Sequence, residues 1–230
     1  SKAKEEMNKE SRYFLPTPLH GFKREFQARS WEGLVKKVVA DPRLKIDEEN
    51  QETWAKLLMM VIYTESGGNP EALNPSGAMG LAQIKPAEAA DAAIKLGIRE
   101  YNLAKPWDNL ILATRELQKQ YYMFGDEASL IFAAYNLGQG TLIKALQTYL
   151  ISDLKLPVAQ VKDDFENMGK DGKSDPATRE YVQRYKITLQ HLLDSPAVTA
   201  KLKSLGFSQE DLNGIYRYFI AANELYQTKV

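Results

Sequence analysis

Apolar residues recur at intervals of three and four along nearly the whole 230-residue chain, whereas sustained alternation of apolar and polar residues is almost absent. The first pattern is typical of amphipathic helices and the second of half-buried strands. The sequence therefore predicts a mainly α fold with at most a small β-hairpin. With 44% hydrophobic residues, a chain of this length has enough apolar side chain for one substantial core.

One apolar stripe leads directly to a carboxylate. Its members are Trp54, Leu57, Leu58, Val61 and Ile62. The next position on the same helical face is Glu65, and Gly67 and Gly68 then end the helix. A carboxyl group at this place is partly desolvated and lies at the negative end of the helix dipole, so we expect a raised pKa for Glu65. A general acid needs such a pKa, but from spacing alone a Glu that reaches solvent at a helix end is the commoner interpretation.

The chain outside this helix divides into helical and turn-forming segments. Residues 67–86 are rich in Gly, Pro, Asn and Ser, which indicates a loop with room for a short hairpin. The charged stretch 163–175 indicates a mobile surface connection, and apolar spacing predicts a single helix over 178–193. The simplest division is an N-terminal arm and helix (1–48), a central domain (49–195) and a C-terminal helical appendage (196–230) packed on the same unit.

Composition excludes several classes of function. There is no cysteine, and the two histidines, His20 and His191, stand far apart with no second motif beside either, so we expect no metal site and no cofactor. Lys and Arg number 30 and so do Asp and Glu, which gives no overall attraction to nucleic acid. No apolar run approaches the roughly 20 residues of a membrane-spanning helix. The sequence leaves open whether a signal or lipid anchor precedes the chain.

Four short segments, taken in order, point to a known family. They are ESGGNP at 65–70, GAMGLAQI at 77–84, AYNLG at 134–138 and TREYVQR at 178–184. These segments resemble the ordered motifs of the soluble lytic transglycosylases, which belong to the goose-type lysozyme superfamily. The stretch 102–109 resembles the family's approach to the helix after the active-site loop. The resemblance covers roughly residues 54–193 and implies a lysozyme-like helical domain.

The resemblance also implies roles for residues of the first two motifs. Glu65 is expected to be the catalytic acid and base. Ser66, next to it, is expected to orient the carboxylate or to contact the sugar. Gln83 is expected to line the glycan cleft. Ala82 stands where the family usually has Met, which we expect to widen a sugar subsite.

The later motifs are expected to supply the wall of the cleft and a tyrosine near Glu65. The resemblance implies that Tyr135 and Asn136 form its wall, and that the Tyr181 hydroxyl lies near Glu65 and helps to set its ionisation. Taken alone, Tyr181 would more often be a core aromatic residue. Leu137 replaces a residue that is usually small in the family, which we expect to narrow a subsite.

The distribution of acidic residues bears on the type of reaction. Hydrolytic glycosidases need a second carboxylate, but residues 72–82 contain no acidic residue and Glu71 is the nearest candidate. This favours the transglycosylase reaction, which cleaves the β-1,4 bond between MurNAc and GlcNAc in peptidoglycan glycan strands and leaves 1,6-anhydromuramic acid ends. A goose-type hydrolase and a non-catalytic peptidoglycan-binding scaffold remain alternatives. The implied location is the bacterial envelope, in the periplasm, and a phage-borne wall-degrading component is a further possible source.

Overall fold

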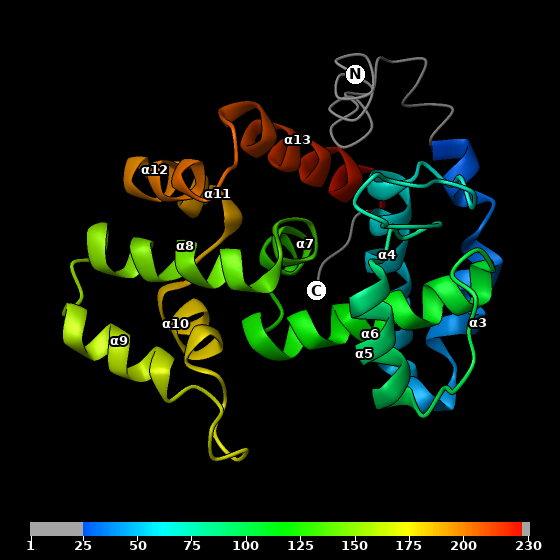
Figure 1. Ribbon diagram of the computed structural model, residues 1–230, viewed down its shortest axis with the longest axis horizontal. Helices are drawn as coiled ribbons and strands as arrows, with labels where there is room; N and C mark the ends of the chain where they lie inside the picture. The colour runs from blue at the N-terminus through cyan, green and yellow to red at the C-terminus, as the bar shows by residue number, and fades with distance from the viewer. Residues whose placement is uncertain (1–24, 227–230) are drawn as a thin grey trace. The chain divides into compact units, whose positions relative to one another are not determined.

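The structure is a computed structural model that describes residues 25–226, and it is built almost entirely from helices (Figure 1). The elements in chain order are α3 (Glu32–Val39), η1 (Pro42–Leu44), α4 (Glu48–Glu65), α5 (Pro86–Leu96), α6 (Pro106–Phe124), α7 (Ala128–Leu137), α8 (Gln139–Ser152), α9 (Val158–Glu166), α10 (Ala177–Tyr185), α11 (Leu189–Leu193), α12 (Pro196–Ser204) and α13 (Gln209–Tyr226). This confirms the mainly α fold predicted from the sequence. The first 24 residues of the expected N-terminal arm and helix, with His20 among them, lie outside the described residues.

The loop between α4 and α5 contains the β-type pairing seen in the described residues. It consists of two isolated antiparallel bridges, from Leu73 to Met79 and from Met79 to Ile84. Residues 67–86 therefore form a folded loop with bridge pairs and no regular hairpin.

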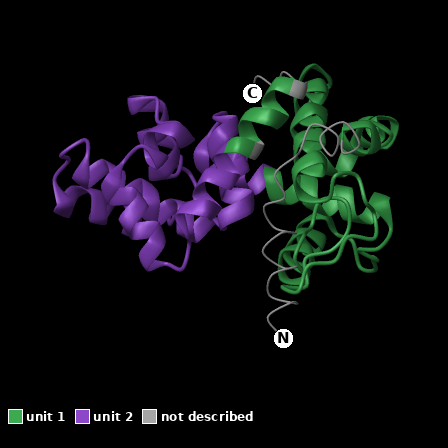
Figure 2. Ribbon diagram, turned by 90° about the horizontal axis from the view of Figure 1, so that it is seen from above, with its two compact units in different colours: residues 1–117, 217–230 green, residues 118–216 purple. Residues whose placement is uncertain are grey.

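The helices group into two compact units, shown in Figure 2. Unit 1 contains the described residues up to Leu117 together with those from Arg217 on, and unit 2 contains Gln118–Tyr216. The boundaries fall inside α6 and α13. The three-part division made from sequence remains a prediction, because this grouping by contacts divides the chain on a different basis.

The centre of unit 1 is the second half of α4. Seven consecutive residues, Leu57 to Tyr63, are each at most 4% exposed. The apolar stripe predicted one buried face, but Met59, Met60 and Tyr63 are buried as well, so this half of the helix is enclosed on all sides. Burying a large apolar side chain contributes about 1.5–3 kcal/mol. The helix that carries Glu65 is therefore strongly anchored up to its last turn.

Unit 2 is organised around α8, which packs against α7, α9, α11 and α12. Its inward residues are Leu142, Ala145, Leu146 and Leu150. The prediction of a single helix over 178–193 is wrong. Helix α10 ends at Tyr185, and Lys186 adopts a left-handed conformation with φ of 51°. Ile187 is buried in this break, and Thr188 starts α11 by accepting a hydrogen bond from the His191 backbone N–H. The structure also differs from the expected connection over residues 163–175, because α9 extends into this segment as far as Glu166.

Two features of the described residues bear on the expectations from composition. Between residues 25 and 226, no helix is both long and apolar enough to cross a bilayer. The same residues contain no group of three or more His, Cys, Asp or Glu side chains placed to hold a metal ion.

Candidate active site

Glu65 is the last residue of α4, and its side chain is half-buried. The Ser66 backbone N–H donates to the Ile62 carbonyl at 3.2 Å and completes the helix. Gly67 and Gly68 then take left-handed conformations, with φ of 61° and 85°, and turn the chain away. The predicted position of Glu65 at a glycine-terminated helix end is confirmed, whereas its raised pKa stays a prediction.

The Ser66 hydroxyl joins the end of α4 to the following loop. It donates to the Leu81 carbonyl at 2.7 Å and accepts from the Gly68 backbone N–H at 3.1 Å. A hydroxyl engaged in this way fixes the backbone next to Glu65. Of the two roles implied for Ser66, this geometry supports orientation of the carboxylate.

The turn after Glu65 is also held from the N-terminal side. The indole N–H of Trp31 donates to the Gly68 carbonyl at 2.9 Å. The backbone of Gln27 and Ala28 also lies so close to Gly68 that a Cβ at position 68 would be 2.5 Å from the Gln27 carbonyl carbon. The turn is therefore packed against residues 27–31, directly before α3.

Gln83 lies in the same loop, and its backbone has a left-handed φ of 49°. Its side-chain amide donates to the Ala72 carbonyl at 2.8 Å and to the Gly80 carbonyl at 3.0 Å. The Gly80 backbone N–H also donates to the Ala72 carbonyl at 2.8 Å. Gln83 therefore uses its NH₂ group to close the loop, and its expected contact with glycan stays a prediction.

The loop has an anchor that the sequence did not reveal as functional. Asn109, in the first turn of α6, has no exposed surface and donates from its amide nitrogen to the carbonyls of Met79 at 2.8 Å and Leu103 at 3.0 Å. Its side-chain oxygen accepts from the Ala82 backbone N–H at 2.9 Å. The sequence offered two indirect signals: Asn109 ends the stretch 102–109 that resembles the family, and it stands directly before the apolar run Leu110–Ala113.

The remaining site residues belong to unit 2. Tyr135 and Asn136 lie near the end of α7, both half-buried, and the Asn136 amide donates to the Phe132 carbonyl at 3.0 Å. Because Glu65 and Gln83 belong to unit 1, the expected cleft formed by both sets stays a prediction.

Two positions depart from the family pattern, and both are buried. Ala82 has no exposed surface and Leu137 is 7% exposed. Each side chain therefore packs inside its own unit, next to the motif in which it lies. Their expected effects on sugar subsites have to act through this packing.

Tyr181 is 4% exposed and donates its hydroxyl hydrogen bond to the Asp164 carboxylate. Its ring stacks between Phe165 and Tyr185, with centroid distances of 6.0 and 6.2 Å. Burial, and then the Asp164 carboxylate, raise the pKa of Tyr181 to about 12. The expected proximity of Tyr181 to Glu65 stays a prediction, since the two residues belong to different units.

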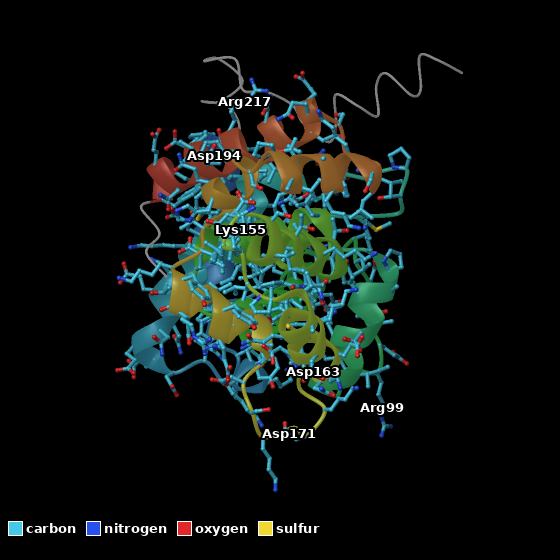
Figure 3. The ribbon with its side chains drawn as sticks, turned by 90° about the vertical axis from the view of Figure 1, so that its left-hand side faces the viewer. Arg99, Lys155, Asp163, Asp171, Asp194 and Arg217 are labelled. Carbon is cyan, nitrogen blue, oxygen red and sulfur yellow. The ribbon has the colours of Figure 1, made fainter. Side chains whose placement is uncertain are left out.

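A cavity of about 400 Å³ lies beside this tyrosine. Its lining includes Asp163, Asp164, Asp175, Glu180 and Arg184. Asp163 on α9 and Asp171 on the turns that follow are labelled in Figure 3. The segment 163–175, expected from sequence to be only a connection, thus supplies the partner of a site tyrosine.

Asp164→Asn is expected to lower the pKa of Tyr181, because it removes the negative charge that disfavours the tyrosinate. In wild type the raised folded-state pKa contributes stability that is complete below the unfolded-state value near 10 and is lost as pH rises through about 12. NMR titration of ring-labelled tyrosine, with Tyr181→Phe for assignment, measures the shift. Asp194→Asn, at an exposed position of unit 2, is the control. An unchanged Tyr181 titration in Asp164→Asn would contradict the pairing.

Residues 44–153 match the family model described as "Transglycosylase SLT domain". Over 86 residues the chain is 36% identical to the soluble lytic murein transglycosylases of Salmonella typhimurium and Escherichia coli K12, which covers 36% of this chain and 13% of each relative. Over 113 residues it is 31% identical to the membrane-bound lytic murein transglycosylase E of Buchnera aphidicola, which covers 44% of this chain and 48% of that protein.

The chain thus spans about an eighth of the length of the soluble relatives and about half that of the membrane-bound one. The matched segment extends from the residues before α4 to the end of α8 and includes Glu65, Gln83, Asn109 and Asn136. Tyr181 lies beyond it. Residues 44–153 are thus the part of the chain that is similar to the transglycosylase SLT family.

Proposed function

We propose that this protein is a peptidoglycan lytic transglycosylase that cleaves the β-1,4 bond between MurNAc and GlcNAc. The observation that carries the proposal is the position of Glu65 inside the matched SLT domain, at the end of a buried helix whose last turn is tied to the adjacent loop by Ser66. The curated relatives are lytic murein transglycosylases by name. The proposed place of action is the bacterial cell envelope, in the periplasm, where this substrate lies.

In the proposed mechanism Glu65 acts first as an acid and then as a base. Its carboxyl proton passes to the glycosidic oxygen as the bond between that oxygen and C1 of MurNAc breaks. The C6 hydroxyl of the same MurNAc then attacks C1, and its proton passes to the Glu65 carboxylate. A 1,6-anhydro ring results, and Glu65 returns to its protonated form. A hydroxyl held on the same sugar has a high effective concentration and competes well with water.

The need for only one carboxylate fits the loop that follows α4. Residues 72–82 contain no acidic side chain, and Glu71, which precedes them, is exposed. An exposed Glu is poorly placed to activate a water in an enclosed site, where a hydrolase needs its second carboxylate.

Digestion of purified sacculi is expected to release muropeptides that end in 1,6-anhydromuramic acid, each lighter by one water than the hydrolytic product. Mass spectrometry of the digest measures this directly. Glu71→Gln is expected to give the same products at a similar rate. Reducing ends as the main product, with loss of activity in Glu71→Gln, would identify a hydrolase. Binding to sacculi without any product would identify a binding protein.

Asn136→Ala is expected to weaken glycan turnover while costing less than about 1.5 kcal/mol of stability. The change removes one side-chain hydrogen bond to the carbonyl four residues earlier, together with the amide proposed to contact an N-acetyl or peptide group. Turnover on sacculi and thermal unfolding measure the two effects. Thr148→Ala is the matched control, because the Thr148 hydroxyl makes the same kind of bond to the Lys144 carbonyl on α8. Unfolding of Asn136→Ala would instead make Asn136 a structural residue.

A further inference from the structure

The buried side chain of Asn109 forms hydrogen bonds with backbone groups of two separate segments. Both hydrogens of its amide group are used, by the carbonyls of Met79 and Leu103, and its oxygen accepts from the N–H of Ala82. The side chain has no exposed surface. Since buried backbone groups need partners, this amide replaces the hydrogen bonds that a regular strand or helix would otherwise supply.

The segment that Asn109 holds is also the one that touches the residue next to Glu65. Leu81 lies between the anchored residues Met79 and Ala82, and its carbonyl accepts the hydrogen bond of the Ser66 hydroxyl. Asn109 and Ser66 thus both form hydrogen bonds with the backbone of the short loop 79–82.

Gln83 also forms a hydrogen bond with this loop, and the close contact between the loop and Asn109 depends on Gly80. The Gln83 amide donates to the carbonyl of Gly80, inside the anchored segment. A Cβ added at Gly80 would lie 2.2 Å from the Asn109 amide nitrogen and 2.8 Å from the Leu103 carbonyl oxygen. The loop can therefore approach Asn109 this closely only because position 80 has no side chain.

We infer that Asn109 is a positioning residue, which acts through loop 79–82 to hold Glu65 and Gln83 in the arrangement needed for catalysis. This inference rests on the proposed function. Asn109 is buried in unit 1 and is assigned no contact with substrate. Its effect on the rate comes from the position of the loop, because displacement of a catalytic group by about 1 Å costs on the order of a hundredfold in rate.

Asn109→Asp is the sharpest test, because it keeps the size of the side chain and replaces the donor NH₂ by an oxygen. At neutral pH the introduced carboxylate faces the carbonyl oxygens of Met79 and Leu103 and repels them. Burial and these oxygens raise the pKa of the introduced carboxyl, so lowering the pH protonates it and restores one donor. We expect kcat on sacculi to fall at least about tenfold at neutral pH, and the ratio of variant to wild-type kcat to recover as the pH falls.

Asn102→Asp is the matched control. Asn102 is exposed, and its side-chain oxygen accepts from the Ala104 backbone N–H, a role that Asp keeps while adding the same charge. Its kcat is expected to stay within about twofold of wild type at every pH. All rates are measured below the melting temperature of each variant, so that loss of folded protein does not enter kcat.

The outcomes distinguish failure of the proposed function from failure of the positioning role of Asn109. No product with wild-type protein overturns the proposed function. Active wild type with an unchanged kcat in folded Asn109→Asp, or a kcat ratio that is lowered but independent of pH, overturns the positioning role. If Asn109→Asp does not fold, Asn109→Ser decides, because it removes the same NH₂ donors without adding charge. A lowered kcat in folded Asn109→Ser supports the role, and an unchanged kcat overturns it.

Discussion

Glu65→Gln is expected to lower turnover of sacculi by at least about three orders of magnitude, because the amide can neither donate nor retrieve the proton. General acid and base catalysis each contribute about 10² to 10⁴-fold. Folding is expected to survive, since the substitution keeps the size of a half-buried side chain at the end of an anchored helix and removes the cost of a partly desolvated charge. Stability is expected to stay the same or to rise slightly, as happens when strained functional groups are neutralised.

The measurement is turnover beside a melting curve, for wild type and for two variants. Glu100→Gln makes the same chemical change at an exposed position of unit 1 and is expected to leave both values unchanged. Full turnover by a well-folded Glu65→Gln protein would remove Glu65 from the mechanism.

Gly68→Ala is expected to lower the free energy of unfolding by about 2–5 kcal/mol. Two effects add: the left-handed φ of 85° costs about 1–2 kcal/mol with a Cβ, and overpacking a tight site costs about 1–3 kcal/mol. The new Cβ would lie 2.5 Å from the Gln27 carbonyl carbon and 2.7 Å from the Ala28 nitrogen, which are backbone atoms that cannot rotate away.

Gly97→Ala isolates the first of these two effects. Gly97 ends α5 with φ of 68°, and a Cβ there would meet nothing within 4 Å. Its expected cost is therefore only the conformational one, about 1–2 kcal/mol. Urea unfolding of both variants measures the difference, and equal losses would show that the backbone around Gly68 relaxes freely.

The sequence predicted α4 and its end well, because both signals are local. Five apolar residues at helical spacing and two consecutive glycines determine the face and the terminus of the helix within one short segment. The break between α10 and α11 had no such signal. Residues 178–193 keep helical spacing on both sides of the break, but burial of Ile187 and capping by Thr188 favour a turn there. The Thr188 cap is local, but the burial of Ile187 depends on tertiary packing, which overrides local periodicity.

The candidate site shows the same distinction between local and long-range information. Glu65, Ser66 and Gln83 lie in short motifs whose order and spacing can be read directly from the chain. Asn109 and Asp164 were missed, since their roles depend on partners 27 and 17 residues away, respectively. Periodicity predicts which apolar faces are buried, but it does not show which backbone carbonyl or which hydroxyl a buried polar group will meet.

The return of α13 to unit 1 has an effect on the order in which the protein can assemble during synthesis. The ring of Tyr226 packs edge-on against Tyr63 with centroids 6.4 Å apart, and the Arg29 guanidinium lies 5.2 Å from the centroid of the same ring. All of unit 2 is translated between these partners. Contacts between such distant positions form late and slowly, and domains generally fold as units as they emerge from the ribosome. A nascent chain can thus complete unit 2 first, whereas the interior beside Tyr63 is completed only after α13 has been synthesised.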